Sequence, residues 1–316
     1  MAWYWWVAIG VATLFVIVLA VAYVCFKIVF CTPKRNPFSD GGEYQLPAGK
    51  AYAPFREQIK EWIKTARALP YEDVAVTSFD GLTLRGKYYE CNPNGVTELL
   101  FHGYHGSGER DLSGGIERCF ALNRNALVVD QRGCASSDGN VVTFGIRERR
   151  DCLTWIRFAV QKFGDDCQLI ITGISMGAAT VLMAAAEQLP SNVKCVLADC
   201  GYTSAKEIIK KVIKDMKLSP TLIYPFVWLG AKLYGGFDLH ETSPIQAVKK
   251  IKIPVIFIHG EKDSFVPCYM SKRLFEDCVA PKAFLSLPDA EHGLAYPVDK
   301  EKYLDALRDF EKEWKK

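Results

Sequence analysis

The chain has 316 residues, of which 49% are hydrophobic and 24% are charged, as expected for a folded protein with a sizeable core. The formal net charge is only +3, and no basic stretch is interleaved with aromatic residues, which speaks against nucleic-acid binding. Eleven cysteines stand without a Cys-x-x-Cys pair or a His/Cys cluster at zinc spacing, so the pattern favours reduced thiols over a disulfide framework or zinc site.

The N-terminal segment 2–26 carries no charged side chain. Val7 to Phe26 alone is long enough to cross a hydrocarbon core of about 30 Å as a helix, and an aromatic group at Trp3 to Trp6 marks one end. A signal peptide is the alternative, but it would need a basic start, a shorter apolar core and a small-residue cleavage site. We therefore expect an uncleaved, single-pass membrane anchor over residues 1–31.

Positive charges follow this segment at Lys27, Lys34 and Arg35. The positive-inside rule then places the large C-terminal part in the cytoplasm. Three charges are a modest bias, so the opposite orientation stays open. No catalytic motif lies before His102, and we expect the chain without residues 1–31 to be soluble and active.

Residues 32–50 contain three prolines and a Gly-Gly pair, which predicts a linker before a domain over 51–316. Tyr52 to Leu69 has helical periodicity, with an apolar face opposite a basic one. Such a helix either lies on anionic lipid or packs on its own domain with a solvated basic face, and we favour the second interpretation.

Alternating strand and helix patterns fill most of the remaining chain. Asp80-Gly81 between two strand-like runs predicts a hairpin. Further strands are predicted at 98–101, 126–129, 169–172, 193–198, 255–258 and 283–287. These runs are apolar on both faces and alternate with helices, which predicts an α/β fold with a mostly parallel sheet covered by helices on both faces. Ligands bind at the carboxyl edge of such sheets.

The segment Gly173-Ile174-Ser175-Met176-Gly177 follows one of these strands directly and leads into a helix-favouring run, Ala178 to Ala186. Strand, tight turn and helix with a serine at the tip form the pattern of a nucleophile elbow. A serine hydroxyl needs a base within reach to become a nucleophile, and this turn holds it clear of the sheet edge. Ser175 is therefore the candidate nucleophile.

Residues 203–242 interrupt the alternation of strands and helices. They hold a predicted helix, 205–217, and a dense apolar and aromatic run, 220–234. An insertion near the carboxyl edge of the sheet is typical of a small cap or lid, and we expect it to cover the site; a peripheral helical hairpin without ligand contact is the alternative.

A nucleophilic serine needs a base, and the base needs an acid that orients it. Of the five histidines, His240, His259 and His292 follow Ser175 in the chain. His292 lies in a short loop after the last strand, and both Asp263 and Asp199 follow strand ends, so the residues leave two candidate acids.

Five motifs of this chain resemble those of the α/β-hydrolase superfamily, in the same order: His102-Gly103, Asp130-x-Arg132-Gly133, the elbow, Pro254 to Asp263, and Glu291-His292-Gly293. Within the superfamily, residues 70–316 are most similar to bacterial serine-aminopeptidase-like and esterase/lipase-like hydrolases, some of which carry an N-terminal anchor.

The resemblance implies Ser175 as nucleophile, Asp263 as acid and His292 as base. It also implies an oxyanion hole made by the backbone N–H groups of Tyr104 and Met176, and a structural role for the Asp130/Arg132 loop. The chain departs from lipases with a His-Gly-Gly-Gly motif, since Tyr104 and His105 follow His102-Gly103.

The expected function is that of a membrane-anchored serine hydrolase that cleaves a carboxylic ester of a small acyl substrate, with lipids among the candidates. The chemistry requires no metal or organic cofactor. Acyl transfer, thioester cleavage and peptide cleavage use the same triad, and a catalytically silent binding protein on this fold is a further alternative.

Overall fold

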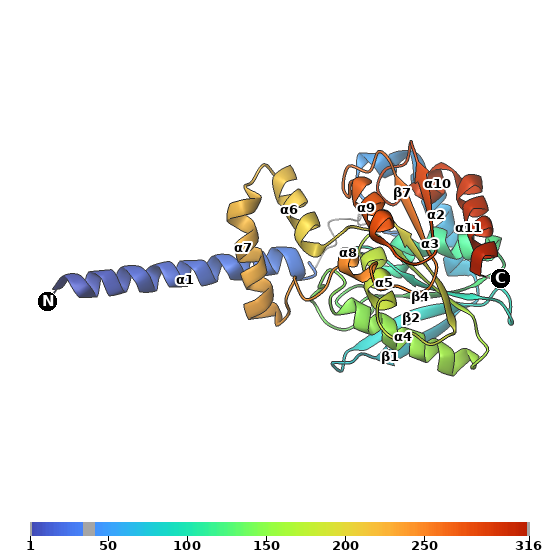
Figure 1. Ribbon diagram of the computed structural model, residues 1–316, viewed down its shortest axis with the longest axis horizontal. Coiled ribbons are helices and arrows are strands. Elements are labelled where there is room, and N and C mark those ends of the chain that lie inside the picture. Colours follow the sequence, from blue (N-terminus) through green and yellow to red (C-terminus); the bar gives the residue numbers. More distant parts are fainter. Residues whose placement is uncertain (1, 34–41, 315–316) are drawn as a thin grey trace.

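An eight-stranded sheet forms the centre of the molecule, with strand order β1-β2-β4-β3-β5-β6-β7-β8 (Figure 1). The computed structural model describes residues 2–33 and 42–314. The strands are β1 (Glu72–Thr77), β2 (Thr83–Tyr89), β3 (Thr97–Phe101), β4 (Asn125–Val129), β5 (Leu169–Ile174), β6 (Val193–Asp199), β7 (Val255–Gly260) and β8 (Lys282–Leu287). β1 and β2 pair antiparallel through the predicted hairpin, and β3 to β8 are parallel to one another.

Helices cover both faces of this sheet, and its central strands are therefore buried along almost their whole length. One face packs on α4 (Glu148–Phe163), α5 (Met176–Ala185) and α9 (Tyr269–Asp277). The other packs on α3 (Gly108–Ala121) and α11 (Lys300–Trp314). Short helices α8 (Pro244–Ala247) and α10 (Ala295–Val298) complete the layers. The expected α/β-hydrolase fold is confirmed.

The amphipathic segment after the predicted linker forms a 3-10 turn, η1 (Lys50–Phe55), and helix α2 (Arg56–Ala68). The apolar side chains Ile59, Ile63 and Ala66 are buried, and α2 lies against α3. The helix therefore packs on its own domain, as favoured from its sequence, and its apolar face is not available to lipid.

Helix α1 (Ala2–Phe30) projects from the domain with most of its side chains exposed (Figure 1). It is long and apolar enough to cross a membrane. Its last turns, however, are built into the domain: Phe30 is buried, the Val142 N–H donates to the Phe30 carbonyl at 2.8 Å, and Cys31 forms a β-bridge with Val141.

Part of the predicted linker, residues 34–41, lies outside the described residues. In the described part, Leu46 is buried against Ile59 and Ile63 of α2. The chain is therefore attached to the domain again before η1 begins.

The insertion between β6 and β7 forms a helical hairpin, α6 (Ala205–Asp215) and α7 (Pro220–Gly230), followed by a π-helical turn, η2 (Ala231–Gly235). Figure 1 shows α7 lying across α1. A Cβ added at Gly230 would overlap the backbone of Ala22, so glycine permits the close approach of the two helices. One apolar side of the insertion is thus buried against α1.

Candidate active site

The predicted elbow is present between β5 and α5. Ser175 has φ +57° and ψ −114°, a strained conformation for a residue with a side chain. A Cβ on Gly173 would overlap Gly177, and a Cβ on Gly177 would overlap the Phe101 carbonyl of β3. The two glycines therefore let strand and helix meet closely enough to force the turn at Ser175.

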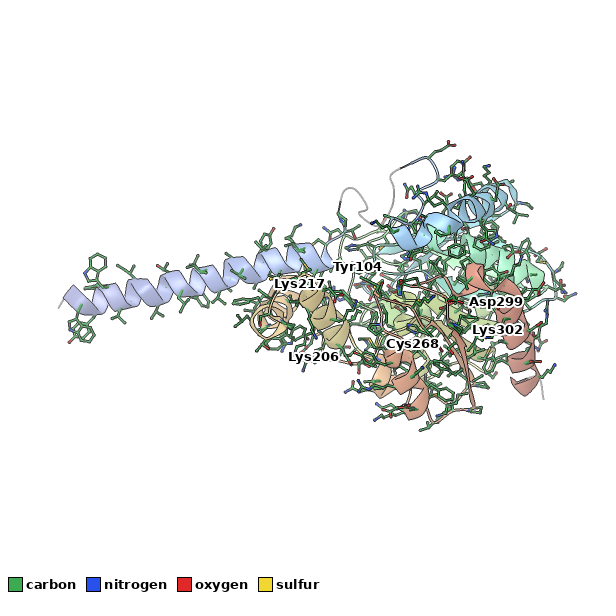
Figure 2. All side chains as sticks on the ribbon, turned by 90° about the horizontal axis from the view of Figure 1, so that it is seen from above. Tyr104, Lys206, Lys217, Cys268, Asp299 and Lys302 are labelled. Carbon is green, nitrogen blue, oxygen red and sulfur yellow. The ribbon has the colours of Figure 1, made fainter. Side chains whose placement is uncertain are left out.

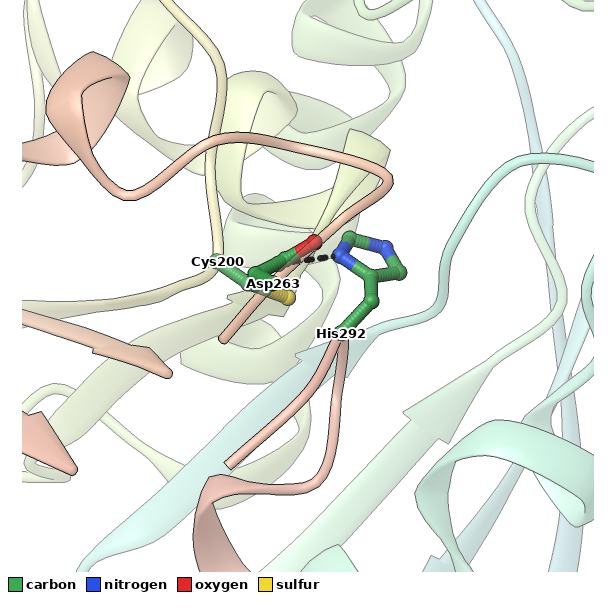
Figure 3. Close-up of side chains that lie close together, drawn as sticks. All are labelled: Cys200, Asp263 and His292. Atoms are coloured by element: carbon green, nitrogen blue, oxygen red, sulfur yellow. Dashed lines mark hydrogen bonds and ion pairs between the residues drawn. The ribbon is translucent and has the colours of Figure 1, made fainter. Parts of the chain in front are cut away.

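His292 links Ser175 to Asp263. Its Nε2 lies 3.0 Å from Ser175 Oγ, and its Nδ1 lies 2.6 Å from Asp263 Oδ2 (Figure 3). The three residues come from loops after β5, β7 and β8, whose carboxyl ends lie at one edge of the sheet. The arrangement places a base within hydrogen-bonding reach of a hydroxyl and an acid on the other nitrogen of that base.

Asp263 is fully enclosed but well supplied with hydrogen-bond donors. The backbone N–H groups of Phe265 and Val266 donate to its Oδ1 at 2.9 and 2.7 Å, and His259 Nε2 lies 3.2 Å from Oδ2. Burial opposes ionisation, but His292 and His259 outweigh it and lower the pKa of Asp263 to about 2. Asp263 is therefore ionised at neutral pH, as an orienting acid must be.

Asp199, the other candidate acid, contacts Tyr303 of α11 and the backbone of Ser175 instead of His292. Its Oδ2 accepts a hydrogen bond of 2.9 Å from the Tyr303 hydroxyl, and its backbone carbonyl accepts the Ser175 N–H at 2.8 Å. Burial raises its pKa, which favours the neutral acid. The structure thus brings Asp263, rather than Asp199, to His292.

The loop that carries the predicted oxyanion donor Tyr104 is braced on several sides. The Gly103 N–H donates to Asp111 Oδ2 at 3.2 Å, and His102 Nδ1 lies 2.7 Å from the Gly103 carbonyl. The Tyr104 side chain points toward the inner end of α1, where Figure 2 labels it. The second predicted donor, Met176, is the first residue of α5, where backbone N–H groups have no intrahelical acceptor.

The remaining histidines have other surroundings. His102 is buried and accepts the Gln131 N–H at its Nε2, 2.9 Å away. His105 stacks on Tyr104, and burial lowers its pKa to about 4. His240 lies in the insertion, 2.9 Å from the Tyr224 hydroxyl. His259 is a second histidine in contact with Asp263, a role that the sequence analysis did not assign to it. The only signal in the sequence was its position four residues before Asp263.

Arg132 and Asp130 have the structural roles implied by the resemblance. The buried guanidinium of Arg132 bonds both carboxylate oxygens of Asp151 and also Asp80. Asp130 accepts the Gly108 N–H at the start of α3.

Cys200 lies beside the pair formed by Asp263 and His292, and potential metal-ligand atoms of the three residues are within 4.8 Å of one another (Figure 3). Asp263 and His292 are already bonded to each other. Burial raises the pKa of the Cys200 thiol well above its usual range. The cluster fits an acid–base pair better than a metal site.

A pocket of about 330 Å³ opens at Ser175 and His292. Most of its lining side chains are apolar or aromatic, among them Ala51, Tyr52, Ile59, Trp62, Leu100, Leu112, Ile174, Leu197, Phe265, Leu294 and Tyr296. The Tyr52 hydroxyl also donates to the His292 carbonyl at 2.8 Å. The local sequence around Tyr52 did not indicate that this residue lines the pocket, because only tertiary packing brings η1 next to the pocket.

The expected lid over this pocket is wrong. No residue of 203–242, all of which the structure describes, lines the pocket. The physical reason is that α7 and η2 pack on α1, while η1, α2 and α3 supply the walls.

Comparison with known proteins places the chain in a family. A family model described as the prolyl oligopeptidase family matches residues 143–316, more than half of the chain. The chain belongs to the prolyl oligopeptidase family. The resemblance to α/β-hydrolases is thereby confirmed.

Three similar proteins illustrate the range of its relatives. Protein YqkD of Bacillus subtilis is 26% identical over 255 residues, covering 80% of this chain and 81% of that protein. The membrane protein YNL320W of Saccharomyces cerevisiae is 24% identical over 187 residues, or 59% of this chain and 60% of that protein. The esterase Pf2001 of Pyrococcus furiosus has the same fold, with TM-score 0.64, 22% identity, and coverage of 79% of this chain and 93% of that one.

Proposed function

We propose that this prolyl oligopeptidase family member is a membrane-anchored serine hydrolase that cleaves a carboxylic ester through an acyl-serine intermediate. The observation that carries the proposal is the continuous line of hydrogen bonds from Asp263 through His292 to Ser175 at a strained elbow. A purely structural Asp–His ion pair would not require a serine hydroxyl on a strained turn beside a pocket. Acyl transfer requires such a hydroxyl as its nucleophile.

The mechanism follows from these positions. Ser175 Oγ attacks the acyl carbonyl while its proton moves to His292 Nε2, and the oxyanion accepts hydrogen bonds from the N–H groups of Tyr104 and Met176. His292 then gives the proton to the leaving oxygen as the ester bond breaks. Water attacks the acyl-serine, His292 takes its proton, and the acid leaves with Ser175 restored. Asp263 holds the Nδ1–H and stabilises the imidazolium.

The pocket supports an apolar acyl group as the bound part of the substrate. Its volume of about 330 Å³ lies at the lower end of the range for small-molecule sites, which suits a short to medium chain. Each buried CH₂ contributes about 0.8 kcal/mol, so binding strengthens with chain length until the pocket is full.

Peptide cleavage is the second candidate, because the family takes its name from peptidases. Both activities use the same triad and differ in what the walls bind. A series of p-nitrophenyl acyl esters and peptide arylamides, tested on the full-length protein in detergent, separates them. Faster turnover of the arylamides would replace the ester proposal with a peptidase.

A fluorophosphonate probe tests the enzyme proposal itself. We expect it to label Ser175 in the full-length protein. A folded protein that neither reacts with the probe nor hydrolyses any ester or amide would instead be a silent binding protein.

Membrane anchorage by α1 completes the proposal. The helix from Trp3 to Phe30 has the length and apolar character of a membrane span, and Lys27 at its inner end favours a cytoplasmic domain. Protease digestion of sealed and of permeabilised cells tests the orientation: protection of the domain in sealed cells supports the cytoplasmic side, and its digestion there contradicts it.

A further inference from the structure

Helix α7 is apolar on both of its faces. Tyr224, Val227 and Gly230 are buried against the domain and α1. Its outward stripe consists of Leu222, Pro225, Phe226 and Leu229, and it continues to Leu233 in η2. Leu222 is 69% exposed and Leu233 is 53% exposed. A helix that is apolar all round belongs either in a protein core or in a membrane, and this outward stripe is not in the core.

The crossing of α7 and α1 lies at a defined height along the membrane helix. The Tyr234 hydroxyl donates to the Leu19 carbonyl at 3.1 Å, and Gly230 lies against Ala22. From Trp3 to Ala22 a helix rises about 29 Å at 1.5 Å per residue, close to the hydrocarbon thickness of about 30 Å. With the aromatic group at one interface, the crossing therefore lies at the other.

The orientation of α7 fits this position. Figure 1 shows α7 running across α1, between the free stretch of α1 and the sheet domain. With α1 spanning the membrane as proposed above, a helix that crosses it in this way lies close to the membrane plane. Its outward stripe then faces the acyl chains of the leaflet next to the domain.

Helix α6 supplies the matching charge. Lys206, Lys210 and Lys214 recur at helical spacing along one flank, and Lys217 follows just beyond the end of the helix. Figure 2 labels Lys206 and Lys217 on the hairpin. Within the described residues, none of the four forms an ion pair with a carboxylate; the nearby Asp215 is paired with Lys211. Lysines beside an apolar in-plane helix are the pattern that binds anionic lipid surfaces.

We propose that the hairpin of α6, α7 and η2, residues 205–235, is an in-plane membrane element. The outward stripe of α7 lies among acyl chains, and the three α6 lysines and Lys217 contact anionic phospholipid headgroups. The inference rests on the membrane span of α1, part of the proposed function, and not on the catalytic chemistry. It gives the domain a second attachment that fixes its orientation on the bilayer.

Photocrosslinking of the full-length protein tests the apolar part. The protein, with p-benzoylphenylalanine at position 222 or 233, is reconstituted into vesicles of phosphatidylcholine and phosphatidylglycerol. The control positions are Ile9 on α1, 54% exposed, and Val279 on the sheet domain, 70% exposed. We expect lipid adducts at 222 and 233 comparable to those at 9 and several-fold above those at 279.

The outcomes separate the two ideas. Adducts at 9 but not at 222 and 233 overturn the hairpin proposal and leave the anchor standing. Absence of adducts at 9 removes the anchor and the hairpin proposal with it, while the ester assays remain unaffected. Specific adducts of 222 with another protein, in native membranes, would also overturn the lipid assignment.

A charge-reversal variant tests the headgroup part. Phosphatidylglycerol should raise the adduct yield at 222 several-fold over pure phosphatidylcholine, and Lys206→Glu with Lys217→Glu should abolish this increase. The matched control reverses two exposed lysines of the sheet domain, Lys252→Glu with Lys302→Glu, and should keep it. An increase that persists in the first variant contradicts headgroup binding by α6.

Discussion

The hydroxyl of Tyr104 donates a hydrogen bond of 2.7 Å to the backbone carbonyl of Val29. Tyr104 follows the glycine of the predicted oxyanion loop, and Val29 lies in the last turn of α1, the proposed membrane anchor. The anchor and the candidate site are therefore in direct contact. Helix α1 is thus a structural part of the domain as well as its proposed attachment to the membrane.

This contact changes the expectation for truncation. Removing residues 1–31 takes away Phe26, Phe30 and Cys31, which are buried in a cluster with residues of α5 and α7. Since each buried Phe side chain contributes about 3–5 kcal/mol, the truncated chain should be unfolded or have a much lower Tm. A chain that begins at Val18 should keep its fold. Circular dichroism melting of both chains in detergent checks this; equal Tm values would contradict it.

Ser175→Ala should remove fluorophosphonate labelling and lower kcat by several orders of magnitude, because it deletes only the nucleophilic oxygen. Its Tm should stay near that of the parent. Ser264→Ala, at another serine of the pocket wall, is the matched control and should keep both labelling and turnover. Substantial turnover by Ser175→Ala would sink the serine-hydrolase proposal.

Asp263→Asn should cost about 10⁴ in kcat, since the amide cannot hold His292 in the required tautomer. Asp199→Asn should cost far less, because burial already favours a neutral side chain there and the hydrogen bond from Tyr303 can be kept. Steady-state kinetics with one p-nitrophenyl ester compares the two. The reverse order of effects would show that the orienting acid is Asp199.

Asp263 should also make stability depend on pH in the acid range. Its pKa is about 2 in the folded protein, below the ordinary value, so its contribution is present above the unfolded pKa and is lost as pH falls through the folded pKa. Between about pH 5 and pH 2 the parent should lose about 2 kcal/mol more unfolding free energy than Asp263→Asn. Urea unfolding of both proteins measures the difference, and parallel curves would contradict it.

The acyl-chain preference should depend on the wall formed by η1 and α2, and not on the insertion. Ala51→Trp fills the pocket, so it should lower kcat/KM for longer p-nitrophenyl esters several-fold more than for the acetyl ester. Phe226→Ala, on the outward face of α7, is the control and should leave the chain-length profile unchanged. A profile that flattens in Phe226→Ala instead would restore the insertion as a lid.

Much of this fold could be predicted because its signals are local. The apolar run 169–172, the glycines around Ser175 and the helix-favouring residues that follow are adjacent in the chain, so the strand, turn and helix can be inferred together. The same holds for the Asp80-Gly81 hairpin and the apolar helix α1. Each of these elements is indicated by an apolar periodicity of two or 3.6 residues or by a turn residue. A short stretch of sequence is enough to show such a signal.

The tertiary structure alone decided which of these pieces meet. Asp199 ends β6 and Asp263 follows β7, and only the positions of β6, β7 and β8 bring Asp263 to His292. The apolar run of α7 could cover a pocket, a sheet edge or another helix, and Tyr52 carried no sign that it would line the site. Apolar burial is non-directional, so a pattern states that a surface must be covered but not by what. That choice depends on distances between elements far apart in the chain, which only the packed structure contains.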